Sequence, residues 1–153
     1  MYRLFLFQLY NIEQNLKGKI VTMMMDGWSN LHVEPIICIS VVDIAEGNVY
    51  LIDTIDTTEH RHTANYLLNL AITAIKTCQK FDCSVRSFVT DNASNMTKMR
   101  NQLLECEELN LSDIITYGCS AHILNLLAKD IDMPHLKEEI KKIIKYFRNT
   151  HFH

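Results

Sequence analysis

The chain has 153 residues, which suits about one domain, and 48% of them are hydrophobic, enough for a core of normal size. Its formal net charge of −3 excludes a self-sufficient basic tail for binding nucleic acid. Any contact with DNA or RNA would therefore need a local basic patch or a further domain.

Cysteine usage and hydropathy limit the environment in which the chain is expected to work. The five cysteines are irregularly spaced and include no C-x-x-C pair, which predicts reduced thiols in a cytosolic or nuclear protein. The apolar run at residues 1–10 is short, and no small-residue cleavage site follows it, so a signal peptide is not expected. No stretch is long enough to span a membrane, and no membrane partner is expected.

The first part of the chain predicts a helix followed by three strands. Helical spacing of apolar residues, broken at Gly18, predicts an N-terminal helix at 1–18 ahead of a domain at 19–153. The predicted strands span 19–26, 36–44 and 49–54. The first is near-continuously apolar, which predicts burial on both faces. A turn at Glu46-Gly47-Asn48 makes the second and third strands antiparallel neighbours.

From Thr63 the hydrophobic period becomes helical, and strands alternate with helices. The predicted elements are a helix at 63–80, a strand at 85–91, a helix from Ala93, a strand at 114–117, a helix soon after Gly118 and a last helix from Pro134. This order predicts an α/β fold with a ribonuclease H-like mixed sheet. Three antiparallel strands come first, alternating α/β elements follow, and helices flank the sheet.

Two acidic residues each end a predicted strand. Asp26 ends the first strand, where Gly27 is expected to turn the chain, and Asp91 ends the fourth. Handed crossovers would place these strands side by side, so the carboxylates would meet at one sheet edge. Such a pair suits a divalent metal, Mg²⁺ or Mn²⁺. The alternative is that both residues only cap turns, since Asp is a favoured turn and N-cap residue.

Three segments together resemble a known family. They are Asp26-Gly27-Trp28-Ser29, then Thr90-Asp91-Asn92-Ala93-Ser94-Asn95-Met96, then Cys119-Ser120-Ala121-His122-Ile123-Leu124-Asn125-Leu126. In this order, each near a strand end, they resemble the transposase core of the hAT superfamily. The similarity is to its DUF659 branch, which is often joined to BED-type zinc fingers, and it runs from about residue 19 to the C-terminus. It implies a nuclear protein whose ribonuclease H-like domain cuts DNA with two divalent metals.

The resemblance also implies roles for individual residues. Asp26 resembles the family's first catalytic carboxylate, which bridges both metals, and Asp91 resembles the second, which holds one of them. The paired metals would activate water or a 3′-hydroxyl and stabilise the leaving oxygen. Cys119 and His122 match the family's C-x-x-H element, in which His122 is expected to touch DNA or position a metal ligand. The alternative, from residue type alone, is that Cys119 is a buried small residue and His122 a core histidine.

Several further candidates have competing interpretations. Trp28 either stacks on a base or only packs, and Asn92 either supports the site or belongs to the turn before a helix. Cys119 and His122 with His60 and His62 offer four zinc ligands, although the two pairs have unrelated spacings. A row of basic side chains on the last helix is either only a solvated face or contacts nucleic-acid phosphates. It comprises Lys137, Lys141, Lys145 and Arg148.

The chain departs from the family pattern at the third catalytic acid. In the family this is a Glu that follows a large helical insertion, and the sequence ends about where that insertion would begin. The expectation is therefore a fragment or a degenerate, domesticated copy of a hAT-type transposase, ancestrally a DNA-cleaving enzyme. Metal binding is expected to be weak or absent, with little or no activity by the chain alone.

Two alternatives belong to different classes of protein. One is a domesticated interaction module that keeps the fold and binds a protein partner or a second copy of itself. The other is a stand-alone metal-dependent nuclease that takes its third acid from the last helix, at Glu138 or Glu139.

Overall fold

The computed structural model describes residues 12–29, 32–106, 114–131 and 134–149. They form two compact units that divide between Cys119 and Ser120. The predicted N-terminal helix lies mostly outside the described residues; within them, residues 12–16 are helical. Leu16 is fully buried, and Gly18 follows with a φ of +71°, a conformation that strains residues with a side chain.

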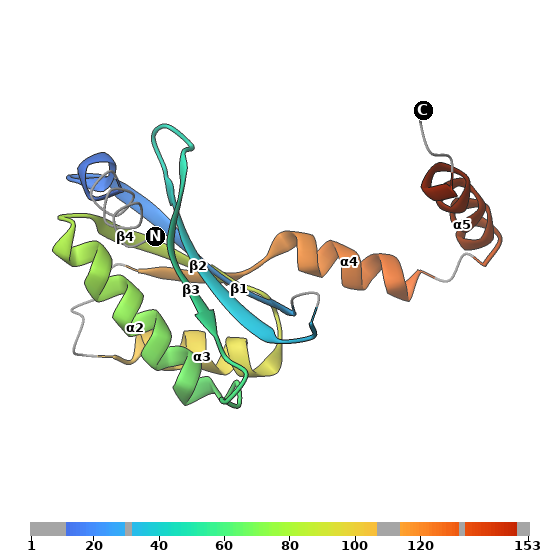
Figure 1. Cartoon of the computed structure of the whole chain (residues 1–153). Helices are drawn as coiled ribbons and strands as arrows, with labels where there is room; N and C mark the ends of the chain where they lie inside the picture. Colours follow the sequence, from blue (N-terminus) through green and yellow to red (C-terminus); the bar gives the residue numbers. More distant parts are fainter. Residues whose placement is uncertain (1–11, 30–31, 107–113, 132–133, 150–153) are drawn as a thin grey trace. The chain divides into compact units, whose positions relative to one another are not determined.

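Five strands of the first unit form one mixed sheet (Figure 1). They are β1 (Ile20–Ser29), β2 (Pro35–Asp43), β3 (Val49–Asp56), β4 (Ser84–Thr90) and β5 (Ile115–Gly118). Their order across the sheet is β3-β2-β1-β4-β5. The first three strands pair antiparallel, whereas β4 joins β1 in parallel and β5 joins β4 in parallel. This is the ribonuclease H-like arrangement, so the predicted fold class is confirmed.

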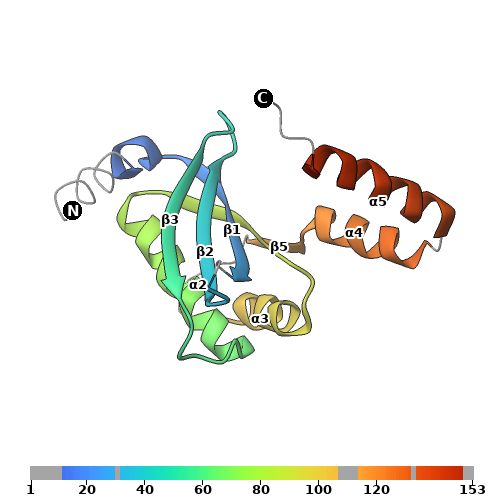
Figure 2. The same cartoon turned by 45° about the vertical axis from the view of Figure 1, so that its right-hand side comes forward.

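Helices α2 (Ala64–Lys80) and α3 (Ser94–Leu104) connect the parallel strands and pack against each other and against β4 (Figure 2). Thr63 begins α2 by accepting a hydrogen bond from the backbone N–H of Tyr66, as an N-cap residue does. On the inner face of α3, Met96, Met99 and Leu103 are buried. These helices cover one face of the sheet and enclose its core.

The course of β1 corrects two predictions. Its burial alternates, with Val21, Met23 and Met25 buried and the side chains between them only half-buried, so the strand is not buried equally on both faces. The strand also does not end at Asp26. It runs on to Ser29 because its last residues still pair with the antiparallel β2, and Gly27 lies inside the strand.

The second unit consists of α4 (Ser120–Asp130) and α5 (Pro134–Asn149). Proline at the first helical position is favourable because its missing N–H would have no partner there, and the predicted start of α5 is confirmed. None of the α4 side chains is buried. Among the described residues, no helix combines the length and apolar character needed to cross a bilayer.

Candidate metal site at the edge of the sheet

Asp26 lies at the point where β1 loses its parallel neighbour. The pairing of β1 with β4 ends at Met25, while the pairing with β2 continues and places Asp26 opposite Cys38. The Asp26 side chain is exposed, and its Oδ1 accepts a hydrogen bond of 3.0 Å from the N–H of Gly27. The carboxylate is thus supported by a strand that remains paired on its other side.

Asp91 directly follows β4, which ends at Thr90, one residue earlier than the predicted strand. Its Oδ1 accepts a hydrogen bond of 2.8 Å from the N–H of Ala93, just before α3 begins. This is the turn interaction that the sequence offered as an alternative to metal binding. It occupies one carboxylate oxygen, so turn capping by Asp91 is compatible with a metal ligand role for the other.

The register of β1 and β4 brings the two acids to neighbouring positions. Met25 and Thr90 are parallel partners, and Asp26 and Asp91 follow them directly. Neighbouring strands lie about 4.8 Å apart, so the two chains leave their shared ladder side by side. The adjacency expected from the crossover rule is therefore present, whereas the sharing of a metal by the two carboxylates stays a prediction.

Arg100 supports the Asp91 turn from inside the molecule, and the sequence analysis missed it. Arg100 is only 8% exposed, and its guanidinium donates to the Asp91 carbonyl at 2.7 Å, to the Thr90 hydroxyl, and to Thr97 Oγ1 at 3.2 Å. Arg100 lies four residues after Met96, so the helical stripe of α3 already placed it on the inner face. A buried guanidinium thus holds the backbone of Asp91 from the interior of the unit.

Asn92 joins the Asp91 turn to the end of β5. Its side-chain amide donates to the carbonyl of Cys119 at 3.3 Å, and the N–H of Cys119 donates to the carbonyl of Thr90 at 2.7 Å. Gly118 gives Asn92 the space it needs, because a Cβ atom there would lie 1.7 Å from Asn92 Oδ1. Asn92 and Cys119 therefore hold the sheet edge together, a structural role for two predicted site residues.

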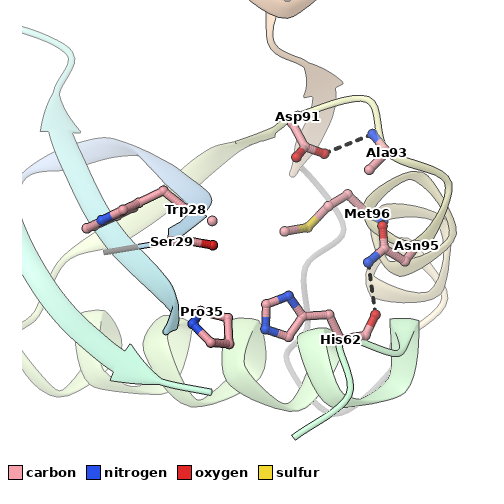
Figure 3. Close-up of a pocket in the computed structure, with 9 residues that line it drawn as sticks. Trp28, Ser29, Pro35, His62, Asp91, Ala93, Asn95 and Met96 are labelled. Carbon is pink, nitrogen blue, oxygen red and sulfur yellow. Dashed lines mark hydrogen bonds between the residues drawn. The ribbon is translucent and has the colours of Figure 1, made fainter. Parts of the chain in front are cut away.

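A pocket of about 290 Å³ opens beside the carboxylates (Figure 3). Asp91 lines it, whereas Asp26 is not among its lining residues. His62 reaches it from the segment before α2, and Asn95 from the first turn of α3. Trp28 also borders it and is 46% exposed, but its indole ring points away from Asp91 and Met96. Trp28 is thus available to solvent, and its predicted stacking on a base stays a prediction.

The predicted Cys-x-x-His element spans the boundary between the two units. Cys119 is half-buried at the end of the first unit, and His122 falls in the first turn of α4 in the second. The role of His122 therefore stays a prediction. Within the described parts of the chain, no group of three or more His, Cys, Asp or Glu side chains could hold a metal ion. The zinc set with His60 and His62 includes residues of both units and stays a prediction.

The donor chemistry of the sheet edge fits a hard divalent cation. Asp26 and Asp91 each use one carboxylate oxygen for a local backbone hydrogen bond. The remaining oxygens are the ligand type that Mg²⁺ prefers, and Mg²⁺ commonly takes one or two carboxylates and completes its shell with water or substrate phosphate. Two carboxylates therefore suit a Mg²⁺ or Mn²⁺ site at this edge, and metal binding by this chain stays a prediction.

The strand order and the paired acids define this chain as a protein with a ribonuclease H-like fold and a candidate carboxylate site at its sheet edge. It belongs to the family described as Domain of unknown function (DUF659), whose model matches residues 6–149. No significant match was found among curated protein sequences.

Solved structures similar to the chain include two forms of one viral enzyme domain. The trimeric HTLV-2 integrase catalytic core domain in complex with magnesium is 14% identical, with a TM-score of 0.39 over 89% of this chain and 78% of that chain. The dimeric form is 16% identical, with a TM-score of 0.38 over 76% and 73%. Marinitoga piezophila Argonaute in complex with a 5′ OH guide RNA is 16% identical, with a TM-score of 0.41 over 60% of this chain. The chain spans only 15% of that Argonaute.

Proposed function

We propose that this chain is part of a hAT-type transposase core whose ancestral reaction is metal-dependent DNA cleavage and strand transfer. The observation that carries the proposal is the register of β1 and β4, which sets Asp26 and Asp91 at adjacent positions. Membership of the DUF659 family and the three ordered motifs support it further. A nuclear location and DNA as the ancestral partner belong to the same proposal.

In this proposal Asp26 and Asp91 hold a divalent metal, Mg²⁺ or Mn²⁺, through the carboxylate oxygens that the local turns leave open. Such a metal supplies activation of water or a 3′-hydroxyl and stabilisation of the leaving oxygen. The protein's own contribution is rigidity. β2 keeps Asp26 in a paired strand, and Arg100 fixes the backbone of Asp91 by hydrogen bonding to its carbonyl.

The chain alone is proposed to bind the metal weakly and to cleave DNA poorly or not at all. The support is the donor count, because no third metal-binding side chain lies with Asp26 and Asp91 among the described residues of the first unit. Glu138 and Glu139 are exposed on α5 and pair with Lys141 and Lys142 at 2.7 Å. If either glutamate instead completes the site, the chain is a stand-alone nuclease and Glu138→Gln or Glu139→Gln abolishes its activity.

Calorimetric titration with Mn²⁺ tests the carboxylate site. The unmodified chain should bind Mn²⁺, and Asp26→Asn and Asp91→Asn should each remove the binding while leaving the thermal unfolding transition in place. Asp53→Asn is a matched control, because Asp53 lies on β3 and its Oδ1 likewise accepts the N–H of the next residue. Equal binding by all four proteins, or none by any, would overturn the site; robust Mg²⁺-dependent DNA cleavage would overturn the proposed lack of activity.

A second candidate function is binding to another protein or to a second copy of the chain. The observation that favours it is the apolar character of the second unit, where α4 has no buried side chain. Six aliphatic side chains of these helices are more than half exposed: Ile123, Leu124, Leu127, Leu136, Ile143 and Ile144. Exposed apolar clusters commonly mark interaction surfaces.

Light scattering after size-exclusion chromatography tests this second candidate. If α5 is an association surface, the chain should elute as a dimer or larger assembly, and Ile140→Glu combined with Ile144→Glu should return it to a monomer. Lys142→Gln is the control, since it removes only an exposed ion pair of small energetic weight. A monomer at all concentrations would exclude self-association.

A further inference from the structure

The pocket beside Asp91 contains a histidine whose environment selects one ring tautomer. Thr57 is fully buried, and its hydroxyl contacts the carbonyl of Pro35 at 3.0 Å and Nε2 of His62 at 2.6 Å. A hydroxyl has one hydrogen, and a carbonyl can only accept. Both contacts are hydrogen bonds only when Thr57 donates to Pro35 and His62 Nε2–H donates to Thr57. The neutral imidazole then carries its hydrogen on Nε2, leaving Nδ1 as an acceptor.

The other ring nitrogen of His62, Nδ1, faces the pocket. In Figure 3 one nitrogen of His62 points towards Pro35, and the other points towards the space between Met96 and Asp91. The His62 backbone is also fixed, because Asn95 Nδ2 donates to its carbonyl at 2.9 Å. The acceptor is therefore held in place by Thr57, from the same loop, and by Asn95, from α3.

The remaining lining determines which ligand chemistry the pocket accepts. Asp91 adds a second acceptor and, among the described residues that line the pocket, the only formal charge, since these include no Lys or Arg. The pocket therefore favours a hydrogen-bond donor and disfavours a phosphate. Pro35 and Met96 supply apolar surface, and methionine sulfur makes favourable contacts with aromatic rings. A volume of about 290 Å³ is near the lower limit, roughly 300 Å³, of small-ligand pockets, which suits one ring system.

We propose that this pocket binds an unpaired nucleobase bearing an exocyclic amino group, whose N–H donates to His62 Nδ1 while the ring lies against Met96 and Pro35. The inference rests on the proposed function, because it takes the ligand class from the nucleic acid that the carboxylate site would act on. The pocket opens beside Asp91, so a base held there would anchor a strand next to the candidate metal site. His62 is then a substrate-positioning residue.

Nitrogen NMR of the histidine rings tests the premise and the binding in one sample. Without ligand, the His62 ring should show the Nε2–H tautomer. Addition of 2′-deoxyadenosine should shift the Nδ1 resonance, whereas N6,N6-dimethyl-2′-deoxyadenosine, which has no amino N–H, should bind roughly three- to tenfold more weakly. An Nδ1–H tautomer, or equal binding of the two nucleosides, would overturn the proposal.

Two variants and a control separate the pocket from its surroundings. His62→Ala should lose deoxyadenosine binding, and His60→Ala should keep it, because the exposed His60 ring stacks on Tyr66 outside the pocket. Thr57→Val removes the acceptor for His62 Nε2–H. The His62 ring should then show a mixture of tautomers, and deoxyadenosine should bind more weakly. If Thr57→Val does not fold, the two nucleosides on the unmodified chain still decide the question.

The outcomes also distinguish this inference from the proposed function. Deoxyadenosine binding needs no metal, so Asp26→Asn should bind it normally even where Mn²⁺ binding is lost. Mn²⁺ binding without any nucleoside binding would overturn the base pocket alone, and the reverse result would overturn the metal site alone.

Discussion

Asn92 and Gly118 fit together so closely that a Cβ atom on Gly118 would lie 1.7 Å from Asn92 Oδ1 and 2.6 Å from its Cγ. Gly118 is needed for this close approach, at the point where β5 ends beside the Asp91 turn. Gly118→Ala should therefore lower the free energy of unfolding by about 1–3 kcal/mol, the usual cost of overpacking. Urea denaturation followed by circular dichroism measures the change.

A double-mutant cycle checks that the cost comes from this contact. Asn92→Ala removes the clashing atoms, so the combined Asn92→Ala and Gly118→Ala protein should be less destabilised than the sum of the two single changes. Gly27→Ala is the matched control, since a Cβ atom there meets only ordinary contacts near 3.8 Å. Strict additivity in the cycle would show that the steric explanation is wrong.

Arg100→Met should destabilise the first unit by about 1–3 kcal/mol, because the buried hydrogen bonds to Thr90 and Asp91 are lost. Arg100→Lys should recover only part of the loss, since an ammonium cannot reproduce the planar fork of donors. Hydrogen exchange should quicken at the Cys119 amide, which bonds to the Thr90 carbonyl. Lys98→Met, an exposed change on the same helix, is the control and should leave stability and exchange unaltered.

Cys38 offers a chemical reporter for the charge at Asp26. Burial raises the pKa of the Cys38 thiol and the Asp26 carboxylate raises it further, while a hydrogen bond with Thr54 acts in the opposite direction. Since the thiolate is the reactive form, Asp26→Asn should speed alkylation of Cys38 by iodoacetamide several-fold near pH 8. Mn²⁺ should also speed the alkylation of Cys38 in the unmodified chain, but not in the Asp26→Asn protein.

Peptide mass spectrometry measures that rate at each cysteine separately. Cys106, which is also half-buried, is the internal control and should react at one rate in every sample. If the alkylation rate of Cys38 changes neither with Asp26→Asn nor with Mn²⁺, Cys38 does not report the charge at Asp26. If Mn²⁺ changes the rate in the Asp26→Asn protein, the metal binds elsewhere.

Asp43 should make stability depend on pH in the acid range. Its buried carboxylate lies 2.9 Å from Lys19 Nζ, and hydrogen bonding to Lys19 and to the N–H of Ala45 holds the pKa of Asp43 below its usual value. A lowered folded-state pKa stabilises the fold above the unfolded-state pKa, near 4, and the stabilisation is lost as the pH falls through the folded-state pKa.

Asp43→Asn should accordingly lower Tm at pH 7, and its difference from the unmodified chain should shrink as the pH is taken below about 4. Differential scanning calorimetry at several pH values measures both effects. Glu59→Gln, which changes an exposed acid in a turn, should alter neither Tm nor the acid dependence. A constant Tm difference across the whole range would contradict the linkage.

The neighbouring placement of Asp26 and Asp91 could be predicted before the structure, because local pattern and chain handedness suffice for it. Apolar runs bounded by turn residues predicted the five strands, and the right-handed crossover placed β4 beside β1. The end of β1 was predicted wrongly. Gly27 suggested a turn, but antiparallel pairing with β2 supplies hydrogen-bond partners up to Ser29 and keeps the strand extended.

The sequence by itself determined the fold class, the family motifs and the strands that carry the two acids, since all of these follow from periodicity and residue type along the chain. Only the tertiary structure decided that Arg100 lies behind Asp91, that Asn92 fills the space above Gly118, and that Thr57 selects the tautomer of His62. The first contact rests on how α3 packs against the end of β4, and the second joins residues from separate elements. The third lies within the loop between β3 and α2, where the carbonyl of Pro35 on β2 orients the Thr57 hydroxyl. Such contacts depend on packing in three dimensions, which no local pattern of residues encodes.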